Sequence, residues 1–368
     1  MRARVAGSLE TVDALESILA ELRPRVREWY PDADATTELH VLDVDSRVVV
    51  HVIRVRVART TGPPATLIVK AGAADIAPDT SDRPRLMPMT DQSERLQLEF
   101  EALRTVEARV AEVGDPRFVA VRPLGVLPEA NALVMEAFDG EPLHRFLVRR
   151  PFRSGVALAP SILARATGRW LRILHDTPST TQVVRQGTSE EVVDAFAAFG
   201  SYLAAEGVSP HIDDVVEAGI AAARRLPDPL LTVITHGDFA PRNILVDRSG
   251  RMAVIDLLLR WQAPAFEDLA GFLVALQTSR ANAATRGLLF GRTIERLEPA
   301  FLTGYYGSEP VPRNAIRVYE LLLVLDKWSA RAIRNRTLGG VRRIRERLID
   351  SHFDTRSRLL ARRLQGRL

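Results

Sequence analysis

Cysteine is absent from the 368-residue chain, which excludes disulfide bonds, thiolate metal sites and a cysteine nucleophile. Long apolar runs are also missing, because nowhere do about 18 uncharged apolar residues, the length that crosses a membrane, follow one another. Residues 1–7 lead into acidic positions rather than into the apolar segment of a secretion signal. We therefore expect a soluble, cytoplasmic protein, and the length suits two lobes with sizeable cores.

Lysine is nearly absent as well, because only Lys70 and Lys327 among the 50 basic residues are lysines and the others are arginines. The arginines are unevenly placed. Residues 331–368 contain 12 arginines against three acidic residues, so this tail is strongly basic while the rest of the chain is mildly acidic. The high isoelectric point is therefore a property of the tail and not a general signature of nucleic-acid binding.

The arginine-rich tail has two interpretations. Its arginines alternate with Val341, Ile344, Leu348 and Ile349, a spacing that favours an amphipathic helix packed by its apolar side. The alternative is a contact with nucleic acid or an acidic membrane surface, but few aromatic residues are available there for base stacking. We favour the packed helix.

The pattern of apolar residues changes near residue 39. Before it, apolar residues at helical spacing over 11–23 predict an amphipathic helix that ends or kinks near Pro24. After it, β-branched runs alternate with one predicted helix over 94–113, which indicates a small antiparallel sheet with a helix beside it. The segment 73–93 is rich in Asp, Pro, Ser and Thr, so we expect a mobile insertion or surface loop there.

The second part of the chain is mainly helical. Apolar residues recur at helical spacing over 159–175, for example. Short strand-like runs over 231–235, 244–246 and 252–255 interrupt the helices, and a hairpin turn joins the last two. We therefore predict an α+β protein. It divides into an N-terminal helical segment, an N-lobe with the sheet and a helical C-lobe, over residues 1–38, 39–138 and 139–368.

The chemically informative segment runs from Thr235 to Asp256. Asp238 lies in a loop, Asn243 follows it at the mouth of an apolar strand, and Asp256 ends the return strand. Because a hairpin brings the start of one strand beside the end of its partner, Asn243 and Asp256 should lie together, with Asp238 beside them. Mg²⁺ prefers one or two carboxylates plus phosphate oxygens. The sequence therefore predicts a magnesium site at this hairpin.

These residues resemble the aminoglycoside phosphotransferase and choline kinase group, small-molecule relatives of protein kinases. The catalytic loop of that group reads His-Gly-Asp, four residues and Asn, followed a strand later by Ile-Asp, and residues 236–243 and 255–256 match it. The resemblance implies a two-lobed protein-kinase-like fold. It also implies that Asp238 accepts the proton of an acceptor hydroxyl and that Asn243 and Asp256 hold Mg²⁺.

The resemblance further implies a nucleotide site in the N-lobe. Lys70, at the end of a β-branched run, would contact the phosphates of ATP, and its rarity in this arginine-rich chain supports a need for a compact ammonium. A helical glutamate should pair with this lysine; we favour Glu99, with Glu101 as the alternative. The backbone of Glu136 and Phe138 would hydrogen-bond to adenine where the chain passes between the lobes.

The chain departs from the family pattern at its first hairpin, residues 43–48. This hairpin contains no glycine, whereas a loop that covers phosphates usually needs glycine for close backbone approach. Side chains such as Ser46 and Arg47 would then contact the nucleotide instead. We expect His175 and Asp268, which also match the family, to have structural roles.

We therefore predict an ATP-dependent phosphotransferase that moves the γ-phosphate to a hydroxyl of a small molecule of the aminoglycoside, sugar or amino-alcohol class. The alternative is a pseudokinase-like, nucleotide-binding regulatory module, which the glycine-free hairpin and the unusual residues 257–259 favour. Asp213, Asp214 and Glu217 would suit a cationic acceptor, but the sequence fixes neither the acceptor nor the oligomeric state. P-loop, Rossmann, serine-hydrolase and zincin motifs do not occur.

Overall fold

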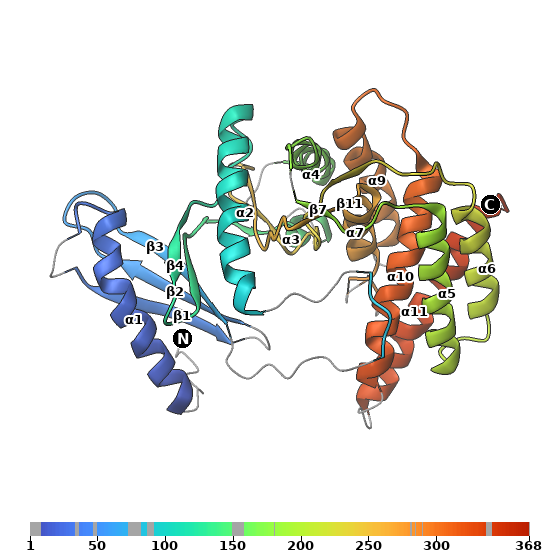
Figure 1. Ribbon diagram of the computed structural model, residues 1–368, viewed down its shortest axis with the longest axis horizontal. Coiled ribbons are helices and arrows are strands. Elements are labelled where there is room, and N and C mark those ends of the chain that lie inside the picture. The colour runs from blue at the N-terminus through green and yellow to red at the C-terminus, as the bar shows by residue number, and fades with distance from the viewer. Residues whose placement is uncertain are drawn as a thin grey trace.

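Figure 1 shows a chain of two lobes, with a β-sheet in one, helices in the other, and helix α2 (Gln92–Val113) standing between them. This arrangement agrees with the α+β fold predicted from the sequence. The computed structural model describes residues 9–33, 37–46, 50–72, 82–86, 92–148, 158–179, 181–279, 282–283, 285–288, 290–335 and 341–367.

The N-lobe sheet is antiparallel, with the strand order β1-β2-β3-β5-β4. Its side chains alternate between the two faces, because successive residues of a strand point to opposite sides. In β2, Ile53, Val55 and Val57 are buried while Arg54 and Arg56 are exposed. The strands are β1 (Leu39–Ser46), β2 (Val50–Val57), β3 (Ala65–Gly72), β4 (Pro123–Leu127) and β5 (Ala132–Glu136).

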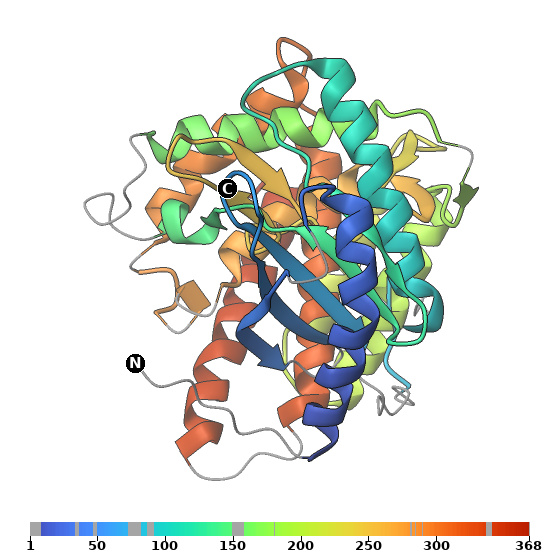
Figure 2. The same cartoon turned by 90° about the vertical axis from the view of Figure 1, so that its left-hand side faces the viewer.

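Helix α1 (Leu9–Trp29) covers the outer face of the sheet, as Figure 2 shows. Leu22, Val26 and Tyr30 pack into one core with the strands. The sequence predicts that this helix ends or kinks near Pro24; it does not end there, because it continues beyond the proline to Trp29. A proline inside a helix costs about 3 kcal/mol, whereas burying a large apolar side chain contributes roughly 1.5–3 kcal/mol. Val26 and Tyr30 together offset the cost of the proline.

Alternation along β3 decides which way Lys70 points. Leu67, Val69 and Ala71 lie in the core under α1, so Ile68 and Lys70 face the opposite side of the sheet. Ile68 packs there against the core that contains α2. Lys70 is therefore directed toward α2 and the second lobe.

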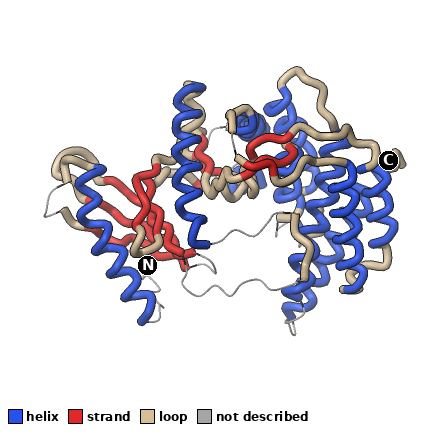
Figure 3. The backbone as a smooth tube through the Cα atoms, in the orientation of Figure 1, coloured by secondary structure: helices blue, strands red, loops and turns tan. Residues whose placement is uncertain are grey.

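The C-lobe begins with short strands and continues as packed helices. Figure 3 shows the short strands between the N-lobe sheet and the long helices, in two small sheets ordered β10-β9-β6 and β7-β11-β8. Helix α4 packs against α9, and α10 packs against α5, α7 and α11. The strands are β6 (Glu141–Pro142), β7 (Gln182–Val183), β8 (Thr232–Ile234), β9 (Ile244–Val246), β10 (Met252–Val254) and β11 (Trp261–Pro264). The helices are α3 (His144–Val148), α4 (Pro160–His175), α5 (Ser189–Ala205), α6 (Ile212–Ala223), α7 (Phe266–Gln277), α9 (Gly291–Tyr306), α10 (Arg313–Asn335) and α11 (Val341–Leu364).

Residues 82–86, between β3 and α2, lie against the C-lobe. Leu86 is buried in the core that α5, α6, α10 and α11 form, and the Arg83 guanidinium lies 2.9 Å from Oδ1 of Asp326. The prediction of a mobile insertion or surface loop over 73–93 agrees with the structure in part. Residues 82–86 form neither helix nor strand, but Leu86 and the ion pair of Arg83 attach them to the C-lobe. The helix α2 also begins inside the predicted loop. Residues 73–81 and 87–91 lie outside the described residues.

Residues 341–364 of the arginine-rich tail form helix α11, which packs against α6 and α10. Phe353 and Leu360 are buried there, and Nη2 of Arg356 lies 3.6 Å from Oε1 of Glu320. This agrees with the predicted packed helix. Within the described part of the chain, no helix has the length and apolar character to span a membrane.

Candidate active site

Lys70 and Glu99 meet where β3 faces α2. The Lys70 ammonium lies 2.7 Å and 2.6 Å from the two carboxylate oxygens of Glu99 and 2.6 Å from Oδ1 of Asp256. Both Lys70 and Glu99 are buried. The alternative partner, Glu101, is exposed and accepts a hydrogen bond from Gln97 on the same helix. The structure therefore brings Glu99, and not Glu101, to the lysine.

Lys70 stabilises the charge of each carboxylate, whereas burial and the charge of Asp256 raise the pKa of Glu99 above its ordinary value. Burial alone would lower the pKa of Lys70, but Glu99 and Asp256 raise it above its ordinary value. Burial would likewise raise the pKa of Asp256, but the Lys70 charge lowers it below its ordinary value. Lys70 is therefore a cation and Asp256 an anion at neutral pH, as contacts with phosphate oxygens and a metal ion require.

The β9–β10 hairpin places Asn243 and Asp256 at the same end. The N–H of Ile255 donates to the backbone oxygen of Asn243 at 2.9 Å, so Asp256 directly follows this contact. Asn243 is buried, and its amide nitrogen donates to the backbone oxygen of Asp238 at 2.9 Å and to Oδ2 of Asp238 at 3.0 Å. The three residues predicted to carry the chemistry therefore come together.

The donor set of this cluster suits Mg²⁺. The amide nitrogen of Asn243 donates to Asp238, whereas the amide oxygen of Asn243 has no hydrogen bond within the described residues. Lys70 engages Oδ1 of Asp256, while Oδ2 has no hydrogen bond in the described part of the chain. Both free atoms are hard oxygen ligands. No group of three or more His, Asp or Glu side chains that could hold a metal exists among the described residues, so an ion here would need phosphate oxygens as further ligands.

Asp238 itself is open to solvent, with 53% of its side chain exposed. Nη2 of Arg242 lies 2.6 Å from each of its carboxylate oxygens, and Asn243 donates to one of them, Oδ2. Two donors therefore fix the orientation of an accessible carboxylate. Such a group is suited to receive a proton from a second substrate.

Asp268, at the start of α7, holds the loop that carries Asp238. Its Oδ2 accepts from the backbone N–H of His236 at 2.6 Å, and its Oδ1 accepts from that of Gly237 at 3.1 Å. The ring of His175 lies 3.1 Å from the same Oδ2. Burial would raise the pKa of Asp268, but the hydrogen bond with His175 lowers it below the ordinary value. His175 and Asp268 thus act as structural supports of the loop.

We expect Asp268→Asn to lower both stability and turnover. An amide offers an N–H₂ group in place of one oxygen, so one of the loop N–H groups would lose its acceptor inside the protein. An unsatisfied buried polar group costs about 1–3 kcal/mol. Thermal unfolding should therefore show a lower midpoint than the wild type. Asp176→Asn, at an exposed ion pair with Arg172, should change the midpoint little. Equal midpoints for the two variants would contradict this role of Asp268.

Several residues next to the Asp238 and Asp256 cluster have an unusual backbone conformation. Gly237 has a φ of 80° and Asp256 a φ of 62°, both in the left-handed region. Glycine adopts this region freely and aspartate tolerates it, but Leu259 also lies there, with a φ of 44°. For a leucine this conformation is uncommon and costs free energy. The turn after Asp256 therefore stores strain beside the predicted metal ligand.

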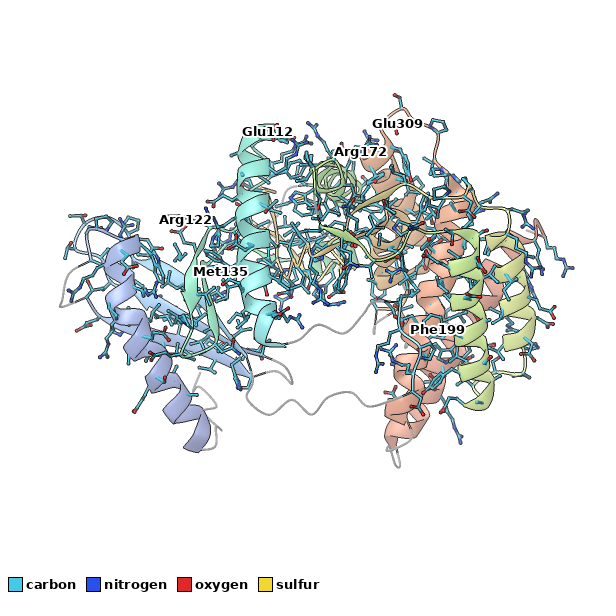
Figure 4. The ribbon with its side chains drawn as sticks, in the orientation of Figure 1. Glu112, Arg122, Met135, Arg172, Phe199 and Glu309 are labelled. Atoms are coloured by element: carbon cyan, nitrogen blue, oxygen red, sulfur yellow. The ribbon has the colours of Figure 1, made fainter. Side chains whose placement is uncertain are left out.

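The predicted adenine contacts lie at the end of β5. The N–H of Glu136 donates to the backbone oxygen of Arg122 at 2.9 Å, and its side chain accepts from Tyr30 at 2.8 Å and from Arg122 at 3.1 Å. Figure 4 labels Arg122 and Met135 in the part of the N-lobe that lies beside α2. The N–H of Phe138 has no backbone partner within the described residues. It therefore remains available to a ligand.

The predicted side-chain contacts from the first hairpin are only partly described. Ser46 is exposed at the end of β1, and its hydroxyl lies 3.0 Å from Nδ1 of His51. Arg47 lies outside the described residues. No contact of the described chain brings Ser46 to the Lys70 cluster.

A cavity of about 140 Å³ opens beside this cluster. Asp238 and Asp256 line it together with two arginines that sequence reasoning missed, Arg95 of α2 and Arg260 of the turn after β10. Arg95 precedes Glu99 by four residues, so helical spacing alone could have placed it on the same face. The position of Arg260 depends on the strained turn, which no sequence pattern predicts.

The paired lysine and glutamate of one lobe face the Asp, Asn and Asp cluster of the other, as in kinase-like phosphotransferases. The chain belongs to the phosphotransferase enzyme family, whose model matches residues 54–300. This membership confirms the predicted family, the two-lobed fold class and the prediction of a phosphotransferase. No curated protein matches the chain in sequence.

Several solved structures resemble the chain along most of its length. Choline kinase LicA from Streptococcus pneumoniae is 12% identical, with 92% of this chain and 99% of that chain covered and a TM-score of 0.49. An ethanolamine kinase of Plasmodium vivax is also 12% identical, with coverages of 91% and 85% and a TM-score of 0.49. Macrolide 2'-phosphotransferase MphH from Brachybacterium faecium is 16% identical, with coverages of 91% and 98% and a TM-score of 0.48.

Proposed function

We propose that this chain transfers the γ-phosphate of ATP to a hydroxyl group of a small molecule. The observation that carries the proposal is the contact of Lys70 with both Glu99 and Asp256. One cation thereby joins the sheet lobe to the hairpin that presents Asn243. A regulatory module without transfer activity would not need the nucleotide-site pair of Lys70 and Glu99 together with Asp238, Asn243 and Asp256. Nothing in the family comparison favours that alternative.

The proposed nucleotide site follows from the groups that remain free. The N–H of Phe138 would donate to adenine, and the Lys70 ammonium would contact the phosphates. Asn243 and Asp256 would hold Mg²⁺, which when bound neutralises charge on the phosphate oxygens. The buried Glu99 keeps the lysine in place, because its two carboxylate oxygens both accept from the ammonium.

Asp238 would perform the proton transfer. The acceptor oxygen attacks the terminal phosphorus of ATP, the bond to the leaving ADP breaks, and Asp238 takes the hydroxyl proton. Arg242 and Asn243 hold the carboxylate in one orientation for this step. Positioning, rather than covalent chemistry of the protein, would supply most of the rate enhancement.

Charges of both signs surround Asp238 on the acceptor side. Burial lowers the pKa of Lys327 on α10, and the charge of Arg242 lowers it further, while Asp238 and Asp326 act in the opposite sense. These groups leave no excess of negative charge that would attract a polycation. We propose a neutral or acidic acceptor, such as a sugar or a sugar acid, rather than a polycation. The acidic residues considered for a cationic acceptor lie on α6, which Figure 1 shows at the outer edge of the C-lobe.

The release of ADP in the presence of ATP and Mg²⁺ tests this function directly. The assay should include sugars, sugar acids, amino alcohols and aminoglycosides as acceptors, with no acceptor as the background. We expect acceptor-dependent ADP release with a neutral or acidic hydroxyl compound, and its loss when a chelator removes divalent ions. Metal-dependent ATP binding without transfer to any acceptor would instead support the regulatory module.

A further inference from the structure

Two arginines from different elements line the active-site cavity. Arg95 comes from the first turn of α2, one helical turn before Glu99. Arg260 comes from the turn that follows Asp256. The same cavity of about 140 Å³ also contains the carboxylates of Asp238 and Asp256 in its lining. The two guanidinium groups therefore converge on the space where the proposed phosphoryl transfer takes place.

No hydrogen bond or ion pair in the described part of the chain engages the guanidinium of Arg95 or that of Arg260. The charge of Arg95 does act on the nearby carboxylates of Glu99 and Asp256. The Nε of Arg260 is buried without a hydrogen-bond partner. Its guanidinium lies over the ring of Trp261, 4.0 Å from the ring centroid, which covers one face of the group and satisfies none of its donors. A buried N–H donor without an acceptor costs free energy.

The two like charges also act on each other. Burial lowers the pKa of Arg260, Glu94 opposes this effect, and the charge of Arg95 adds to it. Arg185, by contrast, pairs directly with the buried Glu267. An anion between Arg95 and Arg260 would satisfy the free donors and remove the repulsion.

We propose that Arg95 and Arg260 form a clamp for the terminal phosphate of the bound nucleoside triphosphate. The inference rests on the proposed function and adds two phosphate-binding residues to it. The planar guanidinium presents paired donors that match phosphate oxygens. Their position beside Asp238 and Asp256 directs these donors to the group that is transferred.

The clamp also accounts for the glycine-free first hairpin. A glycine-rich loop supplies backbone N–H groups to phosphates, and residues 43–48 contain no glycine to permit that approach. Arg95 and Arg260 supply side-chain donors from α2 and from the C-lobe instead. Such donors would also stabilise the charge that builds up on the phosphoryl oxygens during transfer.

The test compares Arg95→Gln and Arg260→Gln with the wild type in the binding of ADP and of a non-hydrolysable ATP analogue, both with Mg²⁺. Each variant should bind the analogue at least about tenfold more weakly, because a hydrogen bond to a charged group is lost. ADP affinity should change by less than about threefold, because ADP lacks the terminal phosphate. Turnover should fall by roughly 100-fold in each variant.

Matched variants separate the clamp from a general loss of structure. Arg104→Gln, on the exposed face of the same helix, should leave both affinities unchanged. Arg95→Lys and Arg260→Lys keep the charge without the planar fork and should give intermediate affinities for the analogue. Equal weakening of ADP and of the analogue, or no weakening of either, would overturn the clamp.

Binding of inorganic pyrophosphate distinguishes the clamp from the proposed function. If the wild type binds pyrophosphate through these arginines but no nucleotide, the ATP-dependent function fails while the anion site stands. If the wild type binds neither the nucleotide nor pyrophosphate, the clamp is wrong as well. If an acidic acceptor, and not the triphosphate, loses affinity in the variants, the site belongs to the acceptor and the clamp is overturned.

Discussion

The Asp238→Asn variant should transfer phosphate about 1,000-fold more slowly than the wild type, within the range for loss of a general base. Asparagine has nearly the same shape and can still accept the hydrogen bond that the side chain of Asn243 donates. It cannot take a proton from the acceptor hydroxyl. The chemical step should therefore suffer while the nucleotide site, built from Lys70, Glu99 and Asp256, stays intact.

Single-turnover kinetics and a separate titration with an ATP analogue check this prediction. The rate of the chemical step should fall, and the affinity for the analogue should stay within about threefold of the wild type, because Asp238 contacts the acceptor and not the nucleotide. Asp194→Asn, at an exposed position on α5, serves as the matched control with unchanged kinetics. An unaltered chemical step in Asp238→Asn would remove Asp238 from its proposed role.

The chemical cluster could be predicted because its geometry is local. Asp238, Asn243 and Asp256 lie within 19 residues, and one short hairpin determines that the last two meet. Lys70 is one of only two lysines in an arginine-rich chain, which makes it noticeable in the sequence. The alternation of side chains along β3 then places Lys70 on the face of the sheet toward α2. For each of these residues, strand alternation or a hairpin turn determines where the side chain lies. Both can be read from the sequence without knowledge of long-range packing.

The features that escaped prediction depend on contacts distant in the chain. Helix α1 passes Pro24 because the sheet buries the residues beyond it. Leu86 becomes part of the C-lobe core although its own segment has no pattern. Arg260 reaches the cavity through the left-handed turn at Leu259, which leucine rarely forms by itself. In these places packing overrides the local preference that a sequence pattern reports.

Replacement of Lys70 by methionine should reduce both stability and activity. Methionine retains much of the aliphatic length of lysine, but it leaves the buried carboxylate of Glu99 without the cation that it contacts directly and facing the charge of Asp256. Removal of one partner of a buried ion pair costs about 3–5 kcal/mol. The value of kcat/KM for ATP should fall by roughly 100-fold, because charge-assisted contacts with the phosphates are lost.

A double variant separates the two effects. In Lys70→Met with Glu99→Leu, an apolar pair replaces the buried ion pair, so thermal unfolding should return most of the way to the wild-type midpoint. Phosphate transfer should not return, because the ammonium is still missing. Glu101→Gln, on the same helix but exposed, should match the wild type in both measurements. Recovery of transfer together with stability would show that Lys70 only supports the fold, and its proposed contact with the nucleotide would be wrong.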